Sequence, residues 1–165
     1  MICPNCKSSY SSICLKCGYD PKTNLATFSA GELGIDELPH VPMEVSHVWL
    51  GKFPNEASLE EYLEETIRDD DVTPMNVFAK SQGEVFYDHD WVEASFEVSD
   101  QLRSLIEGHS YSSDYIDEVI SFANANGIEN ANTFILADVN EFKDPKSVHG
   151  QDVCLWYVGK FKCNV

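Results

Sequence analysis

Positive charge is scarce in this sequence, which holds 11 lysine and arginine residues against 28 aspartate and glutamate residues. The formal net charge of -17 disfavours nucleic-acid phosphates and anionic lipids as partners, because like charges repel. Residues 1–24 carry a net charge of +2, which leaves -19 on residues 25–165. Such a surface attracts a basic protein partner and speeds its association, although acidity can also serve solubility alone. We therefore expect no direct nucleic-acid binding and no membrane association.

Long apolar segments are also missing. Runs such as Phe134–Ala137 are far shorter than the roughly 20 residues that a membrane helix needs. The chain passes from Met1 almost directly into cysteines, without the basic segment and apolar core that are typical of a signal peptide. These absences favour a cytoplasmic, reducing location, where clustered cysteines hold metal more often than they form disulfides.

Two CxxC pairs, Cys3 with Cys6 and Cys14 with Cys17, lie seven residues apart. Four thiolates at this spacing suit one tetrahedral Zn2+ ion, which would be structural because no coordination position stays open. The segment has few apolar residues and would need the ion to hold its shape. The alternative is a redox-active or disulfide-paired set. We predict a zinc-ribbon-like module at residues 1–20.

Residues 21–44 are predicted to be a linker, because prolines and glycines interrupt any periodicity there. Residues 45–165 form the main predicted domain. Its strand-like runs, rich in β-branched and aromatic residues, and its helical patterns alternate along the chain. We expect strands at 45–53, 132–139 and 153–161, and helices near 58–67, 73–83, 100–107 and 113–126.

Several details of this domain follow from individual residues. A capping box formed by Ser58 and Glu61 predicts one helix start, and Thr73-Pro74 predicts another. His47 is expected to be a packing histidine, since its strand offers no second metal ligand two residues on.

The last two strands are expected to pair antiparallel through a long loop. The fold class is therefore α+β, a mixed or antiparallel β-sheet packed with several helices, preceded by a small zinc-ribbon-like module.

The stretch from Val85 to Phe96 sets acidic residues among aromatic rings. Rings beside carboxylates suit the anchor points of a surface that grips a cationic partner. Core packing is the alternative for the rings, and it is favoured for at least one of them. The pattern leaves open whether the second half of the stretch is strand or short helix. The predicted partner contacts are Tyr87, Asp88, Asp90, Trp91 and Glu93, with Asp69, Asp70 and Asp71 at the rim.

Several segments spread over about residues 45–162 carry a family resemblance: His47–Phe53, Glu60–Glu65, Phe78–Lys80, Tyr87–Asp90, Glu93-Ala94, Ser110–Ser112, Ile116–Glu118 and Asn132–Leu136. Together they resemble the immunity protein 22 family of bacterial polymorphic toxin systems. The resemblance implies a cytoplasmic, non-catalytic protein that binds its cognate toxin and blocks it. The family transfers no interface residues, and the cysteine module lies outside the resemblance.

Two other functions fit parts of the sequence. Asp88, His89 and Asp90 could serve a metal-dependent hydrolase, but adjacent residues diverge in direction and no known catalytic motif accompanies them. A zinc-ribbon adaptor in transcription or translation is the other alternative, for which a net charge of +2 on the module is thin support. We favour an immunity protein that binds a toxin with a basic surface, for which a nuclease is one candidate, and we expect no enzymatic activity.

Overall fold

The computed structural model of the protein describes residues 19–20, 25–26, 43–66, 70, 72–99 and 101–164. The chain divides into two compact units, residues 1–41 and 42–165. In the first unit, β1 (Tyr19–Asp20) and β2 (Leu25–Ala26) pair antiparallel. The four cysteines of the predicted zinc module lie outside the described residues, so the zinc prediction stays a prediction.

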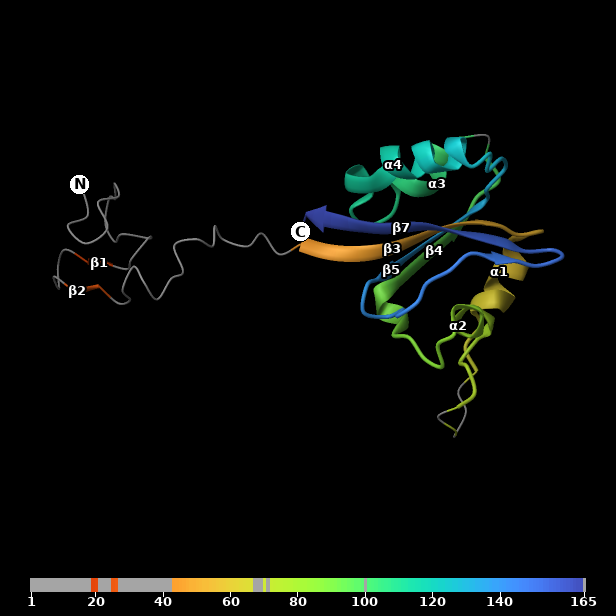
Figure 1. The fold of residues 1–165 in the computed structure, drawn as a ribbon, viewed down its shortest axis with the longest axis horizontal. Coiled ribbons are helices and arrows are strands. Elements are labelled where there is room, and N and C mark those ends of the chain that lie inside the picture. The colour runs from red at the N-terminus through yellow and green to blue at the C-terminus, as the bar shows by residue number, and fades with distance from the viewer. Residues whose placement is uncertain are drawn as a thin grey trace. The chain divides into compact units, whose positions relative to one another are not determined.

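A five-stranded antiparallel sheet is the frame of the second unit, and its strand order is β4-β5-β3-β7-β6 (Figure 1). The predicted α+β class and the three predicted strands are confirmed. The strands are β3 (Met43–Lys52), β4 (Val92–Phe96), β5 (Thr133–Asp138), β6 (Val148–His149) and β7 (Cys154–Asn164).

The predicted pairing of the last two long strands is wrong. Strands β5 and β7 both pair with β3, on its opposite sides, so that Trp49 has Ile135 on one side and Tyr157 on the other. β3 suits this central position because both of its faces are apolar, as expected for a strand covered on both sides. Neighbours in sequence are often neighbours in a sheet, and that tendency misleads here.

Helices α3 (Leu102–Glu107) and α4 (Ser112–Ala125) cover one face of the sheet (Figure 1). Val119 and Ile106 are buried in the same cluster as Phe134 of the sheet. Both helices lie within one residue or two of their predicted ranges, and the apolar residues that follow helical spacing are the ones that pack inward.

The opposite face carries α1 (Glu56–Leu63), α2 (Val77–Gln82) and an aromatic core. The indole of Trp49 meets Phe78 and Phe142 edge to face, each at a centroid distance of 5.4 Å. His47 is buried beside them, 2.9 Å from the hydroxyl of Tyr157 and 3.2 Å from the carbonyl of Phe142. Burial lowers the pKa of His47, so the ring packs as a neutral group, as predicted.

Both helices on this face begin at an asparagine, which corrects the predicted starts. The side chain of Asn55, three residues before the expected cap Ser58, accepts a hydrogen bond from the backbone N–H of Ser58. Asn76 accepts in the same way from the N–H of Ala79, so α2 starts after Thr73-Pro74. Asparagine caps as well as serine does, and only the folded backbone decides between nearby candidates.

The second half of the stretch from Val85 to Phe96, for which the sequence left strand and short helix open, contains both a helical turn and a strand. A 3-10 turn, η1 (His89–Trp91), leads directly into β4.

None of the helices that the structure describes has the length and apolar character of a membrane span. Cys163 is buried and Cys154 is partly buried, and both are free thiols.

Candidate partner-binding site

Four carboxylates surround one hollow at the end of the sheet where β3 begins. Glu44 comes from β3, Asp138 ends β5, Asp90 lies in η1 and Glu93 lies on β4. The cavity has a volume of about 190 Å3, and we call it the carboxylate pocket. The remaining lining residues are Ser46, Trp91, Ser110, Tyr111 and Leu136.

The register of the sheet brings these residues together. Ser46 pairs with Asp138 across β3 and β5, and Glu93 pairs with Leu136 across β4 and β5. Paired residues project from the same face of a sheet, and so do residues two apart along a strand. Three strands therefore direct their side chains into one space, beyond the part of the face that α3 and α4 cover.

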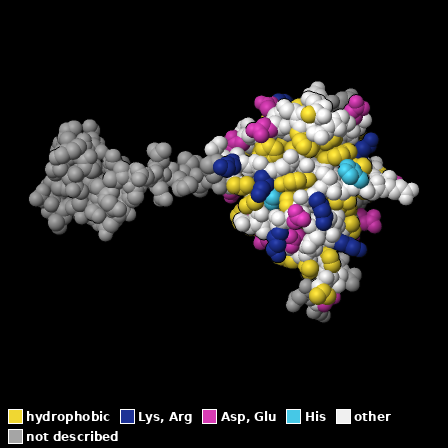
Figure 2. Space-filling model, viewed as in Figure 1, with side chains coloured by type: hydrophobic (Ala, Val, Ile, Leu, Met, Phe, Trp, Pro, Cys, Tyr) yellow, Lys and Arg dark blue, Asp and Glu magenta, His cyan; other side chains and the backbone are white. Residues whose placement is uncertain are grey.

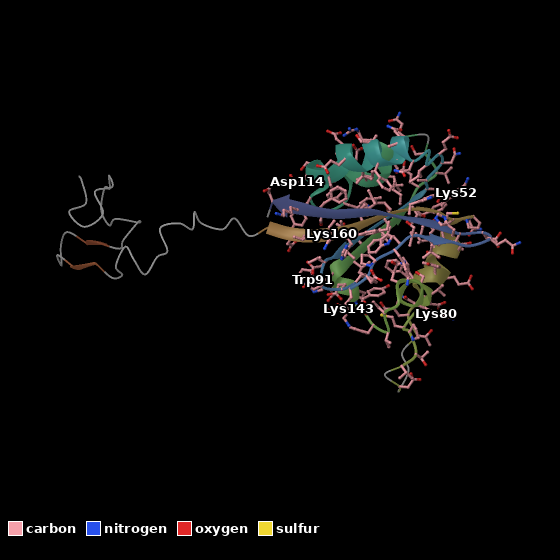
Figure 3. All side chains as sticks on the ribbon, in the orientation of Figure 1. Lys52, Lys80, Trp91, Asp114, Lys143 and Lys160 are labelled. Carbon is pink, nitrogen blue, oxygen red and sulfur yellow. The ribbon has the colours of Figure 1, made fainter. Side chains whose placement is uncertain are left out.

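Two aromatic rings line the pocket. The indole of Trp91 is 52% exposed, a large fraction for a tryptophan, and Figure 3 shows Trp91 at the end of the sheet where β3 begins. Tyr111 has a φ of 56°, in the left-handed region that bulky residues rarely adopt. A hydrogen bond to Glu44 is the largest cause of the raised pKa of Tyr111. The rings offer apolar contact and π faces beside negative charge, which suits a cationic group.

Glu93 is held in place by contacts with the α3–α4 connection. Its Oε2 atom lies 3.0 Å from Nδ1 of His109 and 3.1 Å from the backbone N of Ser110. Partial burial would raise the pKa of Glu93, but the hydrogen bonds from Ser110 and His109 outweigh that cost and leave the pKa below its ordinary value. Glu93 therefore stays ionised and fixed in place.

The other ring nitrogen of His109, Nε2, lies 2.7 Å from Oγ of Ser95. A serine, a histidine and a carboxylate in this order match the contacts of a hydrolytic triad. Hydrolysis also needs donors that stabilise a developing oxyanion. The adjacent pocket offers four carboxylates instead, and these would repel that charge. The arrangement is better suited to holding the α3–α4 connection against β4.

Among the described residues that line the carboxylate pocket, none is a lysine or an arginine. Figure 2 shows basic side chains scattered among acidic and apolar ones on the face turned to the viewer. Histidines contact two of the acids, His109 at Glu93 and His89 at Asp90. The four carboxylates still repel one another, and a cation in the pocket would relieve that repulsion.

A larger cavity, of about 320 Å3, lies beside α4 and offers less chemistry. Its lining includes Leu102, Ile120 and Ile128, and Glu129 is its single carboxylate. It has no aromatic ring and no cluster of like charges. Size alone therefore does not select the candidate site.

Three of the predicted contact residues, Asp90, Trp91 and Glu93, meet in the carboxylate pocket. Tyr87 lies elsewhere, since it is only 3% exposed and accepts a hydrogen bond from Asn76. Core packing was the expected role for at least one of the rings, and Tyr87 has that role.

The other predicted acids have different positions. Asp88 caps η1 by accepting from the N–H of Asp90, and its own N–H donates to Glu141. Asp70 is exposed and its carboxylate accepts from the N–H groups of Val72 and Thr73. Asp69 and Asp71 lie outside the described residues.

The three residues of the hydrolase alternative do not share one centre. His89 contacts Glu65 through Nδ1 at 3.0 Å and Asp90 through Nε2 at 3.4 Å, while Asp88 is engaged as a cap. Among the residues that the structure describes, no group of three or more His, Cys, Asp or Glu side chains is placed to hold a metal ion.

Sequence reasoning missed Glu44, Asp138, Tyr111 and His109. Glu44 directly precedes the strand predicted at residues 45–53, and Asp138 lies near the end of the strand predicted at 132–139, which is the signal that could have found them. That signal becomes usable only once β3 and β5 are known to pair antiparallel, because pairing brings the start of one strand to the end of the other.

A comparison with protein-family models matches residues 46–164 to immunity protein 22. The match covers most of the chain and all of the five-stranded sheet except the first three residues of β3, so the chain belongs to the immunity protein 22 family. It is thus an immunity protein, a class that is generally non-catalytic and binds a cognate toxin. The comparisons with curated proteins and with solved structures returned no match.

Proposed function

We propose that this protein neutralises its cognate toxin by binding a basic surface of the toxin, and that the carboxylate pocket receives a lysine or arginine side chain from that surface. The convergence of four carboxylates and the exposed indole of Trp91 on one hollow carries the proposal. A guanidinium or ammonium group placed there meets carboxylates and a π face together.

Partial desolvation makes such a contact stronger than a surface ion pair. Glu93 is held by two hydrogen bonds before any partner arrives, so little conformational entropy is lost when it binds a cation. The net charge of -17 adds a long-range attraction that raises the association rate for a basic partner. Nuclease toxins fit this chemistry, because clefts that hold phosphate are basic.

The first test is to mix the full chain with the product of the neighbouring toxin gene and measure the dissociation constant by calorimetry at physiological salt. We expect a complex with a dissociation constant well below about 1 μM, as for specific interfaces. Inhibition of the toxin by the same preparation links binding to neutralisation. Absence of a complex at micromolar concentration contradicts the proposal.

A charge-matched pair of variants separates the pocket from net charge. The triple change Glu44→Gln, Asp90→Asn and Asp138→Asn keeps side-chain shape and removes three pocket charges. Its control, Glu60→Gln, Glu61→Gln and Glu64→Gln, removes three charges near α1 and leaves the same net charge. We expect the pocket variant to weaken binding about 30-fold or more and the control to weaken it only a few-fold, as rim charges do. Equal losses would show that the pocket has no special role.

A further inference from the structure

We infer that the free edge of β4 accepts an extended segment of the toxin as an added strand, with a basic residue of that segment opposite Glu93. This inference rests on the proposed function and specifies how the partner is held. It starts from an observation independent of charge, namely the unpaired backbone of β4.

Within the described part of the chain, the backbone of β4 forms ladder hydrogen bonds on one side only. β4 is the first strand of the sheet order and pairs only with β5 among the described strands. The N–H of Glu97 donates to the carbonyl of Asn132 in the continuation of the same register. Hydrogen-bonded pairs alternate in an antiparallel ladder, so Glu93 and Ser95 direct their backbone groups to β5.

Val92, Ala94 and Phe96 therefore direct their backbone groups away from the sheet. The N–H of Val92 donates to the carbonyl of His89 as part of the η1 cap. Within the described part of the chain, no hydrogen bond reaches the N–H of Ala94, its carbonyl or the N–H of Phe96. Ala94 and Phe96 are two residues apart, which is the spacing at which an antiparallel strand forms its hydrogen-bonded pairs.

This edge has little of the usual protection against pairing. Natural edge strands carry charged side chains, proline or a bulge, or they are very short. β4 (VEASF) has no lysine or proline, its register with β5 is regular, and Ala94 at its centre is exposed and small. Its one charged residue, Glu93, lines the carboxylate pocket and would attract a basic segment rather than exclude it. The opposite edge, β6, has only two residues and is too short to guide a partner.

The pairing geometry specifies the chemistry of the added segment. A residue opposite Glu93 would belong to a non-hydrogen-bonded pair, in which side chains approach most closely. It would share the face of Glu93 and reach the pocket beside Trp91. The residue opposite Ala94 would lie on the other face, beside the partly buried Val92 and Phe96, where an apolar side chain fits. The segment therefore alternates basic and apolar residues.

Charge favours a toxin segment over a second copy of this chain. Two chains with a net charge of -17 each repel one another, and pairing β4 with β4 would bring two pockets of carboxylates together. A basic segment of the toxin is attracted by the same negative charge. Light scattering of the protein alone tests this point: we expect a monomer, and a dimer disrupted by Ala94→Pro would overturn the choice of partner.

Residue-resolved hydrogen exchange of the full chain, alone and bound to the toxin, tests the inference directly. We expect the amides of Ala94 and Phe96 to exchange rapidly in the free protein and about 100-fold or more slowly in the complex. The amides of Glu93 and Ser95, which bond to β5, should be protected in both states. A complex in which Ala94 and Phe96 exchange as in the free protein overturns this inference and leaves the proposed function standing. Absence of any complex overturns both.

A pair of substitutions at one position supplies the second measurement. Ala94→Pro removes an N–H that bonds nothing within the described fold, whereas Ala94→Ser keeps it. We expect the proline variant to bind the toxin about tenfold or more weakly than the serine variant, because one main-chain hydrogen bond and the strand approach are lost. Equal affinities of two folded variants contradict strand addition at this edge.

Discussion

Nδ1 of His109 lies 3.0 Å from Oε2 of Glu93, and this contact joins the connection between α3 and α4 to strand β4. The His109 side chain is only 9% exposed, and its ring packs 4.6 Å from that of Phe134. One histidine thus positions a pocket carboxylate and also closes the core beneath it. Stability and the proposed recognition depend on the same side chain.

Replacing His109 by alanine should destabilise the fold. The change removes the contacts to Glu93 and Ser95 and leaves a gap beside Phe134, which together cost about 2 to 4 kcal/mol of unfolding free energy. Urea denaturation followed by circular dichroism measures the loss. His149→Ala, at an exposed position, is the control and should change the unfolding free energy by less than about 0.5 kcal/mol. Equal stability of the two variants would show that the His109 contacts do not contribute to the free energy of unfolding.

Acid should weaken the fold partly through Glu93. Its folded-state pKa lies below the ordinary value of 4.5, so the ionised carboxylate stabilises the fold above that pH. This contribution is lost as the pH falls through the folded-state pKa, because the unfolded chain takes up its proton first. Urea midpoints measured from about pH 6 to pH 3 should therefore decline more steeply for the wild type than for Glu93→Gln. Parallel curves would contradict this role.

Truncating Trp91 should affect binding more than stability. Trp91→Ala removes a half-exposed ring from the carboxylate pocket, so we expect the toxin dissociation constant to rise about 10- to 100-fold, as for an interface anchor. Phe86→Ala is a matched control, because Phe86 is 68% exposed and does not line the pocket. Its dissociation constant should change less than about threefold, as for a peripheral contact. A larger effect at Phe86 would move the recognition surface away from the pocket.

Removal of zinc should affect the amino-terminal unit alone. The spacing of the cysteines predicts one Zn2+ ion per chain, bound by Cys3, Cys6, Cys14 and Cys17. Elemental analysis should find it in the purified protein and should not find it when the four cysteines are replaced by serine. Because residues 42–165 form a separate compact unit, the thermal transition of that unit should persist without the metal. A protein purified without zinc under non-chelating conditions would contradict the cysteine assignment.

The elements of the fold were largely predictable because they depend on local chemistry. Apolar runs of strand length, rich in β-branched and aromatic residues, identified β3, β5 and β7, and helical spacing identified the buried side of α4. Helix starts were less certain, since Ser58 and Asn55 are both good caps and differ only in the backbone that the fold gives them.

Some residues of the carboxylate pocket could be predicted from local sequence, and others could not. Asp90, Trp91 and Glu93 are close in sequence, so local composition was enough to select them. Glu44 and Asp138 are separated by most of the domain, and only the antiparallel pairing of β3 with β5 brings them to one hollow. Tyr87 lies only four positions before Trp91, but Tyr87 is buried in the core and Trp91 is half exposed. The path of the folded chain decides which of the two side chains faces the core.

The sequence by itself determined the excess of negative charge, the strands and helices, and the resemblance that family comparison confirmed, because each is a property of short segments or of composition. Only the tertiary structure decided which strand is central, which edge is unpaired and which acids share a cavity. Those features depend on contacts between residues far apart in the chain. The free energies of such contacts cannot be inferred from the pattern of residues in a short segment.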